Sequence, residues 1–248
     1  REAQLPEGGW NIYDGGPNHL STTVKAYFAL KLNGHSRDEP FMRRAREVIL
    51  DQGGLLRVNV FTKFTLAIFG QIDWRGVPAM PIELLLLPRW SLFNMHEISY
   101  WSRTVLTPLM IIYAHKPVVP VPAGADLMEL RGDLTAKHDY YFPRDARLLS
   151  WRNVFLTADR MLHWYEWHPV QRLRRRATER ATPWMLARMQ GEGGLGGIYP
   201  AMANSVIALR CLGYEVEHPL VARAFKQIEA LEVEDDRTLH LQPCVSPI

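Results

Sequence analysis

The sequence predicts an all-α protein built from repeated helical hairpins. Apolar residues recur at the three- and four-residue spacing of a helix, and no convincing series of strands is found. Residues 27–34 and 206–213 share one pattern, and in both copies a proline, Pro40 or Pro219, follows the closing glycine six residues later. One hairpin cannot bury its own apolar face, so repeated hairpins predict a solenoid or a closed α/α toroid.

The first copy of the repeat predicts two helices. Hydroxyl-bearing residues 21–23 are suited to cap a helix at 24–32, which Gly34 ends. Pro40 opens a second helix at 41–50, because proline is tolerated in the first turn.

The residues between the two copies also have helical periodicity. Pro108, Pro169 and Pro183 are expected to kink or break their helices, because proline lacks the backbone N–H that a helix needs. The predicted segments, in order, are helices at 59–69 and 95–115, loops at 77–88, 117–122 and 133–145, and a broken helix pair at 159–189.

Composition excludes several classes of function. The 248 residues are 47% hydrophobic, enough for a real core, and the net charge of +3 is too small to indicate nucleic-acid binding. Cys211 and Cys244 lack metal-ligand spacing, and the H-E-x-x-H zinc pattern that begins at His96 fails because Tyr100 occupies its last position. The longest apolar run, 104–114, is shorter than the roughly 20 residues that span a bilayer, so only a peripheral membrane contact is open.

Several strings resemble one family. Gln4, Gly8 and Trp10 form Q-x-x-x-G-x-W, which resembles the QW repeat motif of the triterpene cyclases. In the second copy, Leu195 replaces the tryptophan and Gln190 is out of register, so a weaker clamp is expected there. Longer strings resemble bacterial squalene–hopene cyclases, and they lie at 14–17, 36–40, 60–62, 94–103, 196–200 and 245–247.

The resemblance implies an α/α toroid of the terpenoid cyclase type. Residues 1–234 would form the non-catalytic α/α-barrel domain, and 235–248 would begin the crossing into a catalytic domain. Both ends of the sequence are interpreted as cuts in a longer chain. The family is an isomerase or lyase that cyclises squalene to hopene or hopanol without a metal or organic cofactor. It protonates a terminal alkene and directs a carbocation cascade.

The resemblance assigns cavity wall, and no catalytic residue, to this chain. The family acid lies in a D-x-D-D motif that this sequence lacks, so the isolated chain is expected to be inactive. Glu234-Asp235-Asp236 is interpreted as a solvated loop. Tyr199 stands where many relatives have a glutamine that positions the terminating water. The implied cavity residues are Trp101, Ile198, Tyr199 and Pro200, and the implied entry-channel residues are Ile98 and Leu106.

A membrane contact is predicted at Leu162, Trp164, Tyr165 and Trp167. Trp and Tyr favour the membrane interface, and the arginines that follow at 172–176 would attract anionic lipids. Together with the resemblance, this predicts a monotopic protein on the cytoplasmic side of the cell membrane. A buried aromatic cluster beside a solvated helix is the alternative, and a homodimer is left open.

Three other functions remain as alternatives. A related cyclase would act on oxidosqualene or another polyprenoid. A helical-repeat scaffold would bind a partner protein and catalyse nothing. A sugar-acting α/α toroid would need paired carboxylates in a cleft, and the matched strings contain no such pair.

Overall fold

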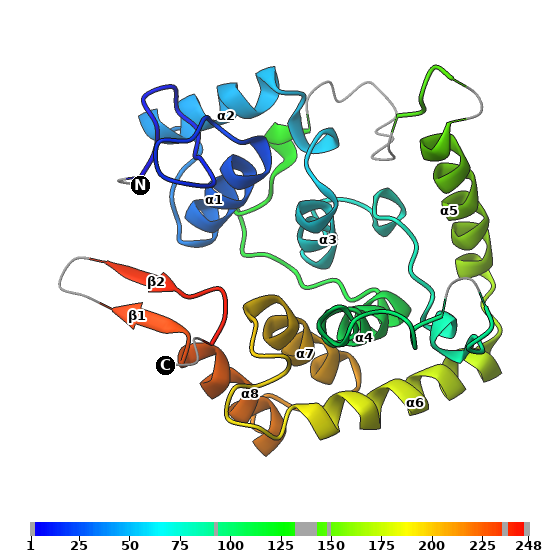
Figure 1. Ribbon diagram of the computed structural model, residues 1–248. Coiled ribbons are helices and arrows are strands. Elements are labelled where there is room, and N and C mark those ends of the chain that lie inside the picture. The colour runs from blue at the N-terminus through cyan, green and yellow to red at the C-terminus, as the bar shows by residue number, and fades with distance from the viewer. Residues whose placement is uncertain (1–2, 92–93, 132–142, 148–149, 235–237, 246–248) are drawn as a thin grey trace. The chain divides into compact units, whose positions relative to one another are not determined.

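The computed structural model describes residues 3–91, 94–131, 143–147, 150–234 and 238–245 (Figure 1). The chain forms two compact units, the first comprising Arg1–Pro78 and Val118–Arg160 and the second Ala79–Pro117 and Met161–Ile248. The predicted domain boundary after residue 234 stays a prediction.

The first unit is built around a helical hairpin. Tyr27, Met42 and Ile49, which belong to the two helices of this hairpin, are fully buried and form its core. The elements of the unit are α1 (Leu20–Leu32), α2 (Pro40–Asp51), η1 (Gly54–Leu56), α3 (Val60–Ile68), η2 (Trp74–Gly76), η4 (Met128–Leu130) and the beginning of α5 (Trp151–Trp167).

A buried polar contact ties the segment around η4 to α1. Lys31 Nζ lies 2.6 Å from Glu129 Oε1, and the Tyr27 hydroxyl donates to the same oxygen at 2.9 Å. Burial, together with the negative charge of Glu129, raises the pKa of Tyr27 well above its ordinary value. The phenol therefore remains a hydrogen-bond donor at neutral pH.

The second unit is built around α4 (Tyr100–His115), which packs against both α6 and α7. Ile111 and Ile112 of α4, Met185 of α6 and Leu209 of α7 are fully buried and form its core. The other elements of the unit are η3 (Ile82–Leu86), the end of α5, α6 (Gln171–Arg188), α7 (Tyr199–Cys211), α8 (Pro219–Glu229), and the antiparallel strands β1 (Glu232–Glu234) and β2 (Leu239–Leu241).

The predicted repeat is confirmed by the geometry of its two hairpins. In α1–α2 and again in α7–α8, the first helix is followed by a glycine with φ of +88°, Gly34 or Gly213. The second helix of each pair begins at its proline, Pro40 or Pro219. The same turn residues thus produce the same local structure in both units.

The all-α class is confirmed, with four local corrections. The side chain of His19, not a hydroxyl of residues 21–23, caps α1. The predicted helix at 95–115 begins at Tyr100, after Ser99 as its cap, and runs on through Pro108. The helix pair predicted at 159–189 corresponds to α5 and α6, and the break between them lies near Pro169 as predicted. However, α5 begins at Trp151, eight residues before the predicted start at residue 159. The fourth correction is the antiparallel strand pair β1–β2, which the sequence did not indicate. The loop predicted at 133–145 lies largely outside the described residues.

The predicted break at Pro183 is wrong, because α6 continues through it. A proline here removes only the hydrogen bond to the carbonyl of Glu179, and both residues are exposed, so water can satisfy that carbonyl. The hydroxyl of Thr182 donates to the carbonyl of Thr178 at 2.9 Å, which supports the turn before the proline.

The QW residues clamp the N-terminal segment onto the first hairpin. Gln4 Nε2 donates to the carbonyl of Gly8 at 2.6 Å and to that of Phe41 at 2.9 Å, in the first turn of α2. Trp10 is buried, and its backbone N–H donates to Thr23 Oγ1 of α1 at 2.9 Å. The motif therefore joins the segment to both helices.

The second unit uses a different glutamine for this purpose. Leu195 is buried where the tryptophan would be, and Gln190 is exposed. Gln227 of α8 instead donates to the carbonyls of Met189 and Gly191, at 3.3 and 2.6 Å, and so satisfies groups at the end of α6. The sequence pattern did not identify this residue.

We predict that Gly8→Ala destabilises the protein more than Gly15→Ala. Both glycines have positive φ, of +102° and +71°, so both substitutions bring a backbone cost of about 1–2 kcal/mol. A Cβ at Gly8 would also lie 2.7 Å from Arg44 Cβ, whereas Gly15 has open space around it. Overpacking should add about 1–3 kcal/mol for Gly8→Ala, as measured by denaturant unfolding. Equal losses for the two variants would show that the contact with α2 is not tight.

Candidate functional site

The structure brings the predicted cavity residues together at one end of the α4–α7 pair. Trp101 lies in the first turn of α4, and the turn at 198–200 begins α7. The glycine loop before α7 touches α4, because a Cβ at Gly196 would lie 2.6 Å from Thr104 Oγ1. The two helices therefore begin side by side.

Aromatic surface is exposed at this end of the pair. Trp101 is 56% exposed and Tyr199 is 40% exposed. Pro200 is also exposed, and Ile198 is half-buried. Large aromatic side chains normally bury most of their area, so this end presents a face suited to an apolar partner or ligand.

The segment after β2 holds the turn at 198–200 in place. The N–H of Tyr199 donates to the carbonyl of Pro243 at 3.0 Å, and the N–H of Val245 donates to the carbonyl of Gly197 at 2.8 Å. Ile198 and Cys244 form an isolated antiparallel bridge between these two bonds. The backbone at the start of α7 is thus fixed by a segment more than 40 residues away in sequence.

The two predicted entry-channel residues lie around the start of α4. Ile98 directly precedes its cap, Ser99, and Leu106 lies in its second turn. Both side chains are half-buried. Nothing in the structure assigns them a channel, so their role stays a prediction.

The predicted membrane residues all belong to the last two turns of α5. Trp164 is 71% exposed and Trp167 is 61% exposed, whereas Leu162 and Tyr165 are half-buried. Further apolar side chains of α5 are exposed, which the sequence interpretation missed, and they include Trp151, Phe155 and Met161.

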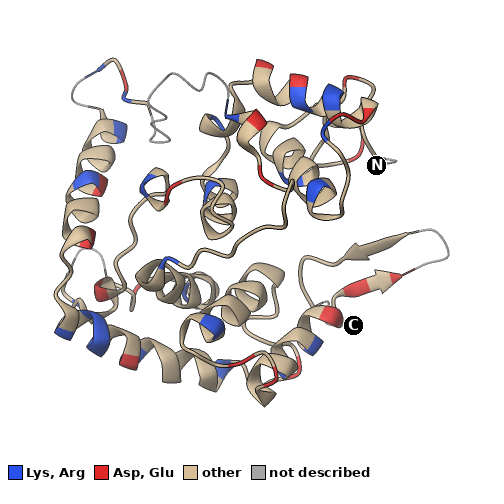
Figure 2. Cartoon of the chain, turned by 180° about the vertical axis from the view of Figure 1, so that it is seen from behind, with Lys and Arg blue, Asp and Glu red and all other residues tan. Residues whose placement is uncertain are grey.

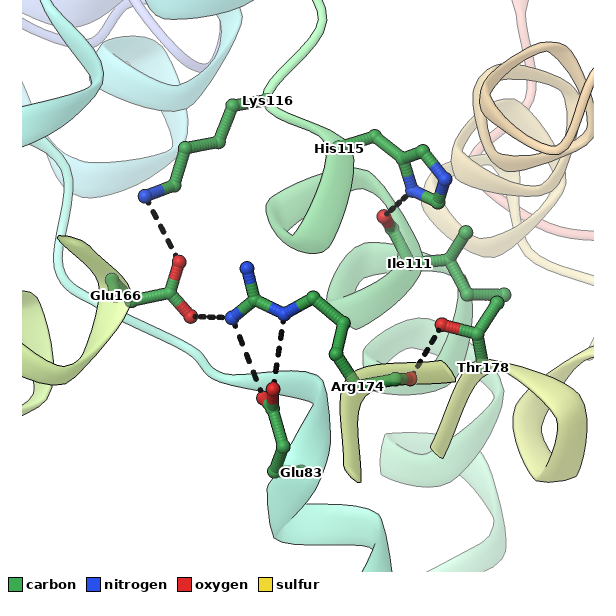
Figure 3. Close-up of polar contacts among 7 residues, drawn as sticks. All are labelled: Glu83, Ile111, His115, Lys116, Glu166, Arg174 and Thr178. Atoms are coloured by element: carbon green, nitrogen blue, oxygen red, sulfur yellow. Dashed lines mark hydrogen bonds and ion pairs between the residues drawn. The ribbon is translucent and has the colours of Figure 1, made fainter. Parts of the chain in front are cut away.

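A network of four charged side chains, with the buried Glu166 at its centre, lies at the end of α5 (Figure 3). Glu166 is 3% exposed, and its two oxygens lie 2.7 Å from Arg174 Nη2 and 2.9 Å from Lys116 Nζ. Arg174 also donates through Nε to Glu83 Oε1 at 3.0 Å. Two carboxylates and two cations thus join the ends of α4 and α5 to α6 and η3.

The network balances the cost of burying its charges. Burial alone would lower the pKa of Arg174, but the hydrogen bond to Glu83 and the charge of Glu166 raise it, so the guanidinium stays charged. Lys116 has φ of +47°, which is uncommon for a residue other than glycine. In this conformation Lys116 ends α4, and its N–H donates to the carbonyl of Ile112 at 2.8 Å.

The network also sets the direction of the tryptophans. On an α-helix, residues two apart are separated by about 200°, so Trp164 projects almost opposite to Glu166. With Glu166 held inside the unit, Trp164 must face outward, and Trp167 lies about 60° from it on the same side. Buried charge therefore determines which apolar side chains are exposed.

Among the described residues, no helix is both long and apolar enough to cross a bilayer. Within the same residues, no group of three or more His, Cys, Asp or Glu side chains is placed to hold a metal ion.

Known proteins resemble the chain along its whole length. The squalene–hopene cyclase N-terminal domain family matches residues 1–237. Squalene–hopene cyclases from Zymomonas mobilis and Bradyrhizobium diazoefficiens are each 41% identical to the chain over all of its residues. The chain spans 38% of the length of each of these two relatives.

We predict that Glu166→Gln destabilises the protein far more than Glu179→Gln. The first change leaves the largely buried Arg174 with one carboxylate and Lys116 with none, and it should cost about 3–5 kcal/mol of unfolding free energy. The second removes an exposed pair, 3.8 Å from Arg175, and should cost less than about 1 kcal/mol. Chemical denaturation of both variants measures the difference, and similar values would refute a structural role for the network.

Proposed function

The chain belongs to the squalene–hopene cyclase family as its N-terminal domain, and from this premise we propose that it is one segment of an enzyme, an isomerase or lyase, that cyclises squalene. The segment supplies part of the cavity wall and a membrane-facing surface. The proton donor belongs to the catalytic domain of the full-length protein, because no D-x-D-D motif occurs in these 248 residues. The isolated segment is accordingly inactive.

One observation carries the cavity proposal: the matched aromatic residues gather, exposed, at one end of the α4–α7 pair. A cyclisation that passes through carbocations needs aromatic faces, because their electron-rich faces attract a positive centre by about 0.5–2 kcal/mol each. Trp101 offers such a face next to the turn at 198–200. The same surface must exclude water, which would end the cascade early.

Tyr199 differs in role from Trp101. Its hydroxyl can hold one water molecule at the rim of the wall, and its ring is 40% exposed. In the proposed enzyme this residue influences whether the last cation loses a proton, giving an alkene, or is trapped by water, giving an alcohol.

The alternative is a related cyclase that acts on oxidosqualene or another polyprenoid and uses the same cavity wall. Analysis of the products formed from each substrate distinguishes this enzyme from a squalene cyclase.

The membrane-facing surface is proposed for the end of α5. Trp164 and Trp167 are exposed, and α6, which follows, carries six arginines and one glutamate along its length (Figure 2). Aromatic rings at the headgroup level and nearby basic groups together suit a protein bound to one leaflet of an anionic membrane. This supports a monotopic location on the cytoplasmic side of the cell membrane, where an apolar substrate dissolves.

For the cavity, we predict that Trp101→Leu lowers kcat of the full-length enzyme about 3- to 30-fold, the loss that corresponds to one cation–π contact. Less completely cyclised products should increase at the same time. Trp101→Phe keeps a π face and should retain most of the activity. Gas chromatography of the products from squalene measures both effects. Equal activity and equal products for the leucine variant and the unchanged enzyme would show that Trp101 is not part of the cavity wall.

For the membrane surface, we predict that the double variant Trp164→Ser, Trp167→Ser loses most of its binding to anionic phospholipid vesicles. Phe61→Ser is the matched control, since Phe61 is 73% exposed and lies on α3 of the first unit. Vesicle flotation, with circular dichroism as the check of folding, compares the variants. Undiminished flotation of the double variant would exclude this surface.

A further inference from the structure

A small hollow lies between α4 and α6 in the second unit. Its volume is about 100 Å³. Arg103 and Thr107, one turn apart on α4, form one side, and Arg180 and Trp184, one turn apart on α6, form the other. His96 lies at its exposed rim.

Arg103 is the unusual group in this hollow. Its side chain is half-buried, and Nε is buried without a hydrogen-bond partner. Among the described residues, neither Arg103 nor Arg180 forms an ion pair or a hydrogen bond through its side chain. Charged groups that leave water are normally paired, so an unpaired buried guanidinium nitrogen calls for an explanation.

The surroundings do not neutralise these cations. No carboxylate of the described residues lines the hollow. Glu97, next to His96 in the sequence, is exposed, and Glu179, next to Arg180, lies near Arg175 instead. Arg188 adds a further positive charge next to Trp184, since its Cζ atom lies 4.0 Å from the centre of the Trp184 ring. Like charges that line one cavity destabilise each other, and an anion bound between them would remove that repulsion.

We propose that this hollow binds a phosphate group, held by Arg103 and Arg180. Guanidinium groups match the oxygen atoms of phosphate with paired, charge-assisted hydrogen bonds. A volume of about 100 Å³ holds several water molecules and is large enough for one phosphate group. The side chain of Arg103, which lines the hollow, then gains the anionic partner that the described residues do not provide.

The phosphate can belong to a phospholipid headgroup or to a free phosphate ion. Trp90 is 88% exposed in the turn just before Met95 and His96, a turn that Asn94 closes with hydrogen bonds to the carbonyls of Arg89 and Ser91. An exposed tryptophan only a few residues before two residues that line the hollow suits a headgroup. The binding chemistry is the same in both cases, and it does not depend on the cyclase proposal.

Calorimetric titration of the full-length protein with inorganic phosphate, at constant ionic strength, tests the site directly. Arg103→Gln and Arg180→Gln should each weaken binding about tenfold or more, because each removes hydrogen bonds to a charged group. Arg223→Gln is the matched control: it removes the same charge from α8, where Arg223 is exposed, and should leave the affinity unchanged. If Arg103→Gln does not fold, Arg180→Gln carries the test, since its side chain is exposed.

Vesicle flotation distinguishes the two sources of phosphate. The same variants are compared on vesicles of phosphatidylglycerol and of phosphatidylcholine. If both arginine variants lose phosphatidylglycerol binding relative to Arg223→Gln, the ligand is a headgroup. If only the titration separates them, the ligand is free phosphate. The proposal is overturned if neither assay separates them from Arg223→Gln, or if all three variants lose binding equally, as for non-specific charge attraction. The Trp164→Ser, Trp167→Ser variant should keep its affinity for phosphate, so a failure of the membrane proposal would be recognised separately.

Discussion

The packing of α4 against α6 and α7 is the constraint on which the second unit depends. Ile111 and Ile112 bury one part of α4 completely, and this leaves little freedom in how the helix is rotated. Its first turn then presents Trp101, and its last residue is followed by Lys116. The orientation of one buried helix thus positions an exposed aromatic face at one end and a buried ion pair at the other.

Small residues make this close packing possible. Ala177 and Ala181 of α6 and Ala201 and Ala208 of α7 are buried, so both helices can approach their neighbours closely. Gly196 extends the same principle to the loop before α7, because any side chain there would collide with Thr104. The meeting of the two helix starts, and hence the aromatic face, depends on these small side chains.

Local structure could be predicted from the sequence, and contacts between distant residues could not. Gly34 and Pro40 determine backbone angles by their own chemistry, so the hairpins were recognisable. The charge network joins Glu83 to Arg174, which are 91 residues apart, and a charged residue in a sequence is most simply interpreted as solvated. Trp164 and Trp167 could be identified from the sequence as a membrane candidate, but their direction follows only from the burial of Glu166.

The cavity residues show the same division. Trp101 and the turn at 198–200 were identified from their resemblance to matched strings, about 100 residues apart, and no physical pattern in the sequence joined them. The pairing of Val245 with Gly197 was also invisible, because it needs a tertiary contact of a segment without helical or strand periodicity. Gln227 was missed for the related reason that its partners are backbone carbonyls, which every residue has.

Two arginines of the second unit show what burial demands of a charge. Arg174 is 14% exposed and meets two carboxylates, and the backbone strain at Lys116 persists beside them. Arg103 is also partly buried, yet no acceptor of the described chain reaches its Nε. Arg131 and Arg188 also have a buried Nε without a partner, but each donates through another guanidinium nitrogen to a backbone carbonyl. The side chain of Arg103 has no such hydrogen bond within the described residues, and this difference is the reason for placing the proposed phosphate beside it.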